Sequence, residues 1–209
     1  MADPAGMSRF KARLRVNSLE TLQYHVLRLK AETRCSKDPT LHQSSSYLMS
    51  IAAEFGRIHI LEFLLLECGL LLYDNAYCLC AACFGQVEAL HWLIVKGFQW
   101  DVRDTSIAAA DHGHVNILVY LAEFHTLLVD QHHFAAAAFR GCIAVMEWLY
   151  ARRCHMDSHV FLSAVRGGRL EAVQWLHDHN CPWDNRAYDH ASRMARTKIA
   201  EFLVANNCV

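Results

Sequence analysis

A small residue recurs along this chain at nearly constant spacing, always four positions after an alanine. We call this residue the landmark of each copy: Gly56, Gly85, Gly113, Gly141, Gly168 and, in the sixth copy, Ala195. The intervals are 29, 28, 28, 27 and 27 residues. A period in this range is typical of one supersecondary unit copied end to end, in which each copy buries its apolar face against its neighbours. The chain is therefore predicted to be a repeat protein.

The residues after each landmark follow the spacing of an amphipathic helix. An aromatic residue stands at the seventh position and a leucine at the eighth in every copy: Phe63-Leu64, Trp92-Leu93, Tyr120-Leu121, Trp148-Leu149, Trp175-Leu176 and Phe202-Leu203. Together with apolar residues nearer the landmark, they form the stripe of one helix face. The second half of each copy is predicted to be a helix of about ten residues.

The first half of each copy is predicted to be a helix as well. An aspartate stands seven or eight positions before the alanine in five copies: Asp74, Asp101, Asp130, Asp157 and Asp184. Aspartate is a preferred N-cap because its carboxylate accepts hydrogen bonds from unpaired backbone N–H groups of the first turn. A glycine landmark then permits the turn into the second helix. The fold class predicted is all-α, an α-solenoid of stacked helix-turn-helix repeats.

Two segments carry a family resemblance. Ala137-Ala138-x-x-Gly141 followed by Glu147-Trp148-Leu149, and the run from Leu170 to Leu176, resemble the core of ankyrin repeats, and the resemblance spans residues 44–209. The Thr-Pro-Leu-His signature is absent, and the period is about four to six residues shorter than the usual 33. The β-hairpin fingers of ankyrin repeats are therefore expected to be shortened or absent. In this respect the chain is similar to short, divergent ankyrin-type repeats of large viruses of amoebae and some protists.

The register divides the chain into a terminal cap and six repeats. Residues 1–43 are predicted to form a degenerate N-terminal capping repeat and a polar loop, and the stretch from Cys35 to Ser46, with Pro39, is expected to be an exposed loop. The six ankyrin-like repeats are predicted at 44–74, 75–101, 102–130, 131–157, 158–184 and 185–209.

Composition favours an intracellular globular protein, cytoplasmic or nuclear, of a host cell if the chain is viral. The first fifteen residues contain no apolar signal segment, and the densest apolar run, 60–73, is interrupted by glutamates and too short to span a bilayer. A net charge of −1 predicts no strong nonspecific attraction to nucleic acid. We expect a monomer that binds neither nucleic acid nor membranes.

The nine cysteines are expected to be free thiols that bind no metal. Cys154, Cys181 and Cys208 occupy equivalent positions, so they should lie one helix-packing distance apart, about 8–10 Å, which is too far for a disulfide. Cys78-x-Cys80-x-x-Cys83 and His177-x-His179-x-Cys181 offer zinc-ligand atoms, but their spacing sends neighbouring side chains to different helix faces. Neither a metal nor a cofactor is predicted.

No catalytic motif occurs in the sequence, so the chain is predicted not to be an enzyme. The ankyrin resemblance implies a protein-protein interaction module or adaptor with a concave binding surface and an unknown protein partner. It also implies the binding residues, which directly precede the landmarks: Glu54, Phe55, Cys83, Phe84, Asp111, His112, Phe139, Arg140, Arg166, Arg193 and Met194.

Other interpretations of the sequence remain open. The aromatic residues before the landmarks can instead pack between neighbouring first helices. The array can also be the substrate-recognition part of a ubiquitin-ligase or signalling assembly, or a cryptic metal-dependent enzyme.

Overall fold

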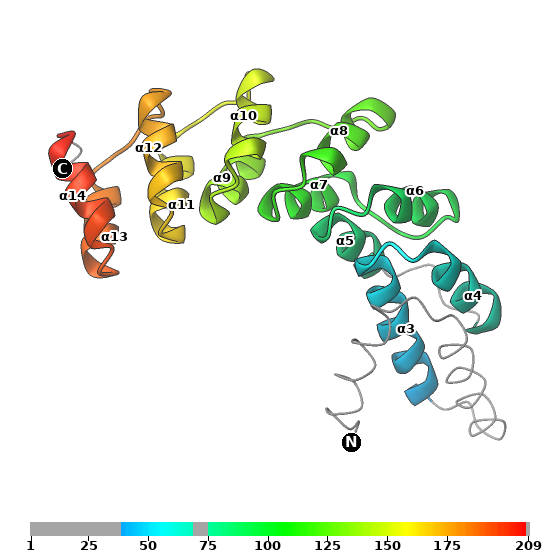
Figure 1. The fold of residues 1–209 in the computed structure, drawn as a ribbon. Helices are drawn as coiled ribbons and strands as arrows, with labels where there is room; N and C mark the ends of the chain where they lie inside the picture. The colour runs from blue at the N-terminus through cyan, green and yellow to red at the C-terminus, as the bar shows by residue number, and fades with distance from the viewer. Residues whose placement is uncertain (1–38, 69–74, 208–209) are drawn as a thin grey trace. The chain divides into compact units, whose positions relative to one another are not determined.

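The computed structural model describes residues 39–68 and 75–207, and within these ranges every regular element is an α-helix. Each predicted repeat contributes two helices (Figure 1). Their bounds are α3 Pro39–Glu54, α4 Ile58–Cys68, α5 Ala76–Cys83, α6 Val87–Val95, α7 Val102–Asp111, α8 Val115–Phe124, α9 Gln131–Arg140, α10 Ile143–Ala151, α11 Ser158–Gly167, α12 Leu170–Asp178, α13 Arg186–Arg193 and α14 Thr197–Ala205. The predicted α-solenoid is confirmed, and the loops in the described ranges contain no strand.

The landmark residues make the turn between the two helices of each repeat. All five landmark glycines have a positive φ, between 64° and 82°, and Ala195 has a φ of 51°. Side chains disfavour this left-handed conformation, and glycine adopts it without a steric penalty. The turn predicted at each landmark is therefore present in all six repeats.

Three of the five predicted aspartate caps are confirmed. Asp101 accepts a hydrogen bond from the backbone N–H of Asp104, Asp157 accepts one from Val160, and Asp130 forms a capping box with His133. Asp74 lies outside the described residues. These caps satisfy N–H groups that have no partner inside the helix.

The cap predicted at Asp184 is wrong in position. The N-cap of α13 is Asn185, whose side chain makes no capping hydrogen bond. The carboxylate of Asp184 is held instead by the guanidinium of Arg186, at 2.6 Å between Nη2 and Oδ2, while Oδ1 also accepts the Arg186 backbone N–H at 3.0 Å. Asp184 therefore still accepts a backbone N–H of the first turn, although the helix begins one residue later than predicted.

The predicted loop from 35 to 46 is wrong from residue 39 onward, because α3 begins at Pro39. Proline suits the first position of a helix, where its missing N–H has no intrahelical partner to lose. The serines that follow are compatible with the helix; the Ser50 hydroxyl, for example, donates to the Ser46 carbonyl at 3.1 Å. The predicted capping repeat falls mostly on residues outside the described ranges.

The helices fall into two compact units, which are described separately. The first contains α3, α4, α6 and the part of α5 up to Ala81, and the second contains residues 82–85 and the chain from Asp101 onward. In the first unit α3 packs on α4 and α4 on α6, and the rings of Tyr77 and Phe98 meet edge to face at 5.6 Å.

In the second unit the first helices of successive repeats, α7, α9, α11 and α13, pack directly on one another. The second helices α8, α10 and α12 lie on the other side of the stack, where they are further apart than the first helices (Figure 1). The buried alanines explain the difference, because a small side chain lets neighbouring first helices approach. Those in the register are Ala109, Ala137, Ala164 and Ala191, all fully buried.

Buried cysteines follow two of the second helices, and their backbone N–H groups bond to carbonyls of the last helical turn. Cys154 and Cys181 donate their backbone N–H groups to the carbonyls of Leu149 and Leu176, at 3.1 and 2.9 Å. Both side chains are buried, and both are free thiols, as are Cys78 and Cys142. Cys208 lies outside the described residues. The predicted role as small apolar fillers is confirmed for Cys154 and Cys181.

Candidate interaction surface

The residues expected to bind a partner lie at the C-terminal ends of the first helices, beside the landmark turns. In the second unit we call this surface the turn edge. It comprises the two residues before each landmark and the one after it: Cys83, Phe84, Asp111, His112, His114, Phe139, Arg140, Cys142, Arg166, Gly167, Arg169, Arg193, Met194 and Arg196. Glu54 and Phe55 hold the equivalent positions in the first unit.

Large apolar side chains are exposed along the turn edge. Phe84 is 49% exposed, Phe139 45% and Met194 54%. The exposed members also include His112, Arg140, Arg166 and Arg193, whereas Cys83 and Asp111 are half-buried. Phe84 and Phe139 are therefore not fully packed away between first helices, since nearly half of the surface of each residue meets solvent.

The expectation that Phe55 is exposed is wrong. Phe55 is half-buried, as is Glu54 beside it. Phe55 continues the last turn of α3, donating its backbone N–H to the Ile51 carbonyl at 3.1 Å. In that position its ring removes part of its apolar surface from water. Phe55 therefore presents less surface to a partner than Phe84, Arg140 and Met194, which hold the equivalent position in the second unit.

In four of the six copies the side chain after the landmark reaches back to a backbone carbonyl of the preceding repeat. In the second unit His114 Nε2 donates to the Cys83 carbonyl at 2.8 Å, and Arg169 Nε donates to the Phe139 carbonyl at 3.4 Å. Cys142 Sγ lies 3.7 Å from the Asp111 carbonyl, and in the first unit Gln86 Nε2 donates to the Glu54 carbonyl at 3.1 Å. These carbonyls belong to last turns of helices, which have no intrahelical donor.

This series of cross-repeat caps was missed by the sequence analysis, although a signal for it exists. Every residue that follows a landmark carries a side chain able to donate a hydrogen bond: Arg57, Gln86, His114, Cys142, Arg169 and Arg196. Because each cap holds the backbone two residues before a landmark, it fixes the backbone from which the exposed turn-edge side chains project.

One ion pair also links neighbouring repeats at the turn edge. Arg140 Nε and Asp111 Oδ2 are 2.9 Å apart, and both side chains are partly exposed. Exposed pairs of this kind stabilise a fold by at most about 1 kcal/mol. The pair therefore orients Arg140 more than it stabilises the stack.

A buried Ser-His-Asp array joins α7 to α9. His133 Nε2 lies 2.7 Å from Ser106 Oγ, and His133 Nδ1 lies 2.9 Å from Asp130 Oδ1. Both Ser106 and His133 are 0% exposed. Desolvation by burial lowers the pKa of His133, against the opposing effect of Asp130, so the imidazole is neutral near pH 7. No sequence motif marks this array, because its residues come from two repeats.

The atoms of this array are those of a serine hydrolase triad, but their arrangement does not suit catalysis. The Ser106 hydroxyl donates to the Arg103 carbonyl at 2.9 Å, and the Asp130 backbone N–H donates to His133 Nδ1 at 3.2 Å. The Ser106 hydroxyl is therefore directed to a backbone carbonyl rather than to the imidazole. Since Ser106 is also inaccessible to a substrate, the array is a packing element.

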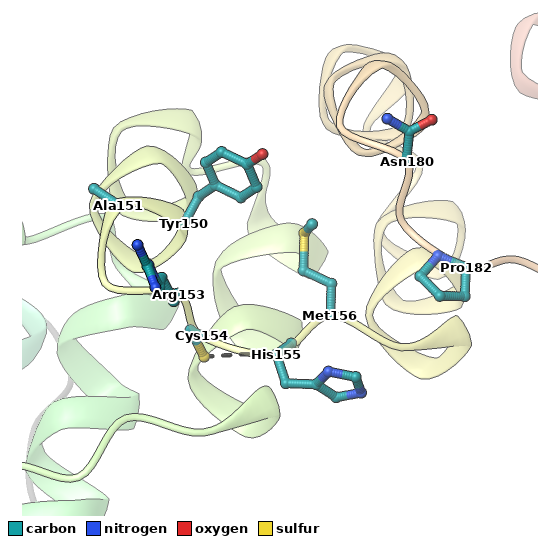
Figure 2. Close-up of a pocket in the computed structure, with 8 residues that line it drawn as sticks. All are labelled: Tyr150, Ala151, Arg153, Cys154, His155, Met156, Asn180 and Pro182. Atoms are coloured by element: carbon teal, nitrogen blue, oxygen red, sulfur yellow. Dashed lines mark hydrogen bonds between the residues drawn. The ribbon is translucent and has the colours of Figure 1, made fainter.

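A shallow pocket of about 560 Å³ lies beside the C-terminal ends of α10 and α12, away from the landmark turns (Figure 2). Its lining residues come from the end of α10 and from the loops before α11 and α13: Tyr150, Ala151, Arg153, Cys154, His155, Met156, Asn180 and Pro182. Burial raises the pKa of the Cys154 thiol to about 11, so this sulfur is not a nucleophile near neutral pH. None of the predicted binding residues lines this pocket.

Within 39–68 and 75–207 there is no group of three or more histidine, cysteine or acidic side chains positioned to hold a metal ion. The helices of the same ranges include none with the length and apolar content needed to cross a bilayer.

Comparison with known proteins identifies the fold. The structure is similar to the crystal structure of the human ASB11 ankyrin repeat domain, with a TM-score of 0.57 and 20% sequence identity over 75% of this chain and 82% of that chain. No family model and no curated protein matches the sequence. At this identity the likeness concerns the fold, which is an α-solenoid of the ankyrin type.

Proposed function

We propose that this chain is a protein-interaction module that binds a protein partner along the turn edge, as a stand-alone adaptor or competitor. The observation that carries the proposal is the row of exposed large side chains on a fixed backbone. Phe84, Phe139 and Met194 are each about half exposed, and Phe139 and Met194 stand next to Arg140 and Arg193 in the sequence. Exposed apolar side chains grouped on one surface are typical of interaction sites, and aromatic and arginine side chains dominate the binding energy of interfaces.

The cross-repeat caps support the same proposal. They hold the ends of successive first helices through His114, Cys142 and Arg169, so the turn edge is organised before a partner arrives. Preorganisation lowers the entropy lost on binding. Ser106 and His133 of the triad-like array in the described residues are buried, so that array does not compete as a catalytic site. Membership of a ubiquitin-ligase or signalling assembly stays a prediction.

The test is affinity capture from the native cell with the full chain and two double variants. Phe84→Ala with Phe139→Ala removes two anchors, and we expect recovery of specific partners, measured by quantitative mass spectrometry, to fall about tenfold or more. Leu128→Ala with Val204→Ala is the matched control, since both side chains are more exposed than 50% but lie outside the turn edge.

The thermal midpoint of all three proteins should agree closely, because exposed side chains contribute little to the core. Equal loss of partners in both double variants would contradict the proposal. Collapse of stability in the Phe84 and Phe139 variant would show that these rings are structural instead.

A further inference from the structure

Five arginines gather on the last three landmark turns. We call Arg140, Arg166, Arg169, Arg193 and Arg196 the arginine row; all five side chains are exposed. They come from the ends of α9, α11 and α13 and from the residues that follow the landmarks Gly168 and Ala195. The row lies entirely within the second unit and within the turn edge.

Contacts between the repeats place these arginines beside one another. A Cβ atom added to Gly167 would overlap the carbonyl of Phe139, so the ends of α9 and α11, which carry Arg140 and Arg166, meet at backbone distance. Arg169 reaches the same Phe139 carbonyl with Nε, and the guanidinium of Arg196 lies over Gly168. The row is therefore continuous across three repeats.

The charge of the row is largely uncompensated. Asp111 pairs with Arg140, whereas Arg166, Arg169, Arg193 and Arg196 form no ion pair with any residue of the described ranges. The negative ends of the helix dipoles offset part of the charge, since each helix C-terminus carries about half an elementary charge.

His190 reports the positive potential at the end of the row. Desolvation by burial is the main cause that lowers the pKa of His190, and the charges of Arg166, Arg193 and Arg196 lower it further. No carboxylate opposes them at this histidine. Its Nδ1 is buried and has no hydrogen-bond partner in the described structure. The row is thus a positive surface whose one paired member in the described ranges is Arg140, held by Asp111.

We propose that the arginine row binds an acidic segment of a protein partner, in an extended conformation along the turn edge. This inference rests on the proposed function and names the chemistry of the partner. Guanidinium groups pair with carboxylates through two parallel hydrogen bonds. Equivalent positions in neighbouring repeats are about 8–10 Å apart, and an extended chain rises about 3.3 Å per residue, so carboxylates about three residues apart match successive repeats.

The observations favour an acidic polypeptide over a nucleic acid. The whole chain has a net charge of −1, so the residues outside the row are net acidic and repel a polyanion that extends beyond it. Met194 lies between Arg193 and Arg196, Phe139 directly precedes Arg140, and both are about half exposed. They can contact apolar side chains of a peptide, which a phosphate backbone does not supply.

The test measures binding of a fluorescein-labelled twelve-residue peptide with glutamate at every third position and alanine or leucine between. We expect the full chain to bind it, with an affinity that falls as salt rises. The same peptide with glutamine in place of glutamate should bind at least about tenfold more weakly. An oligodeoxythymidylate of similar length, labelled in the same way, should bind more weakly than the glutamate peptide.

Two variants of equal charge change locate the site. Arg166→Gln with Arg193→Gln should weaken binding of the glutamate peptide about tenfold, and it leaves the Arg169 cap in place. Arg152→Gln with Arg153→Gln, which removes two exposed arginines at the far end of α10, should change the affinity by less than about twofold. Circular dichroism and urea unfolding check that both variants are folded.

Three results would overturn the inference: equal affinity for the glutamate and glutamine peptides, equal loss in the two arginine variants, or tighter binding of the oligonucleotide. None of these results would change the outcome of the capture experiment with the Phe84 and Phe139 variant, because that experiment measures native partners. Failure of the acidic-segment inference is therefore distinguishable from failure of the interaction module.

Discussion

Ala195 adopts a backbone conformation that the other five repeats give to glycine. Its φ of 51° is left-handed, and a Cβ atom in this region costs roughly 1–2 kcal/mol. The sequence analysis identified Ala195 as the sixth landmark from spacing alone, and the dihedral angle confirms that assignment. Replacing this strained alanine should therefore change the free energy of unfolding.

Ala195→Gly should stabilise the second unit by about 0.5–1 kcal/mol, because relief of the strain exceeds the entropy that glycine adds to the unfolded chain. Urea unfolding measures the change. Ala200→Gly, the same substitution inside α14, should instead cost about 1 kcal/mol. Loss of stability in both variants would contradict the expected strain at Ala195.

His133 makes the packing of α7 on α9 sensitive to pH. Burial lowers its pKa, while Asp130 raises it and Arg103 lowers it. A group whose pKa is lower in the folded state than in the unfolded state binds fewer protons when folded. Its contribution to stability is present above the unfolded value of about 6.5 and is lost as pH falls through the folded value.

The free energy of unfolding should therefore fall between pH 7.5 and pH 5.5 by more in the wild type than in His133→Gln. The comparison is necessary because the chain contains 14 histidines, and the others respond to pH in both proteins. Urea titrations at the two pH values provide the measurement. The same pH dependence in both proteins would mean that protonation of His133 does not affect folding.

The packing of α9 on α11 depends on a glycine that the repeat register does not mark. Gly168 is the landmark, whereas Gly167 before it aligns with Phe84, His112 and Arg140 in other repeats. A Cβ atom at Gly167 would overlap the backbone of Phe139, but one at Gly168 would meet only the flexible end of Arg196. Helix contact, rather than turn geometry, requires the glycine at 167.

Gly167→Ala should therefore cost more than Gly168→Ala, although the sequence pattern ranks them in the opposite order. We expect a loss of roughly 2–3 kcal/mol at 167, because backbone must shift, and about 1 kcal/mol at 168, from left-handed strain. Thermal or urea unfolding of the two variants compares them. Equal losses, or a larger loss at 168, would refute this account of the α9 and α11 contact.

The ends of the second helices follow a pattern that the sequence analysis overlooked. Twelve residues after the landmark, Gly97, Arg153, Asn180 and Asn207 all have positive φ. Glycine and asparagine are typical of this helix-ending position, so the two asparagines were a usable signal. Arg153 concealed the pattern, because its side chain has no preference for left-handed backbone.

The net charge of the whole molecule does not reveal where the molecule carries a charged surface. A net charge of −1 correctly describes the chain but conceals the arginine row, since acidic residues elsewhere offset it. Repeat proteins separate framework from surface: buried positions recur in every copy, while exposed positions vary. For this reason the register located the turn edge, whereas the chemistry of that edge depended on which variable residues stacking brought together.

The sequence by itself determined the helices, the turns and the fold class, because caps, apolar stripes and left-handed turns act within about ten residues of the chain. Only the tertiary structure decided which residues from different repeats meet. His114 caps Cys83, Ser106 contacts His133, and Gly167 meets Phe139, across separations of 27 to 31 residues. Such pairs depend on the axial spacing and rotation of one helix pair on the next, which packing sets and local sequence does not encode.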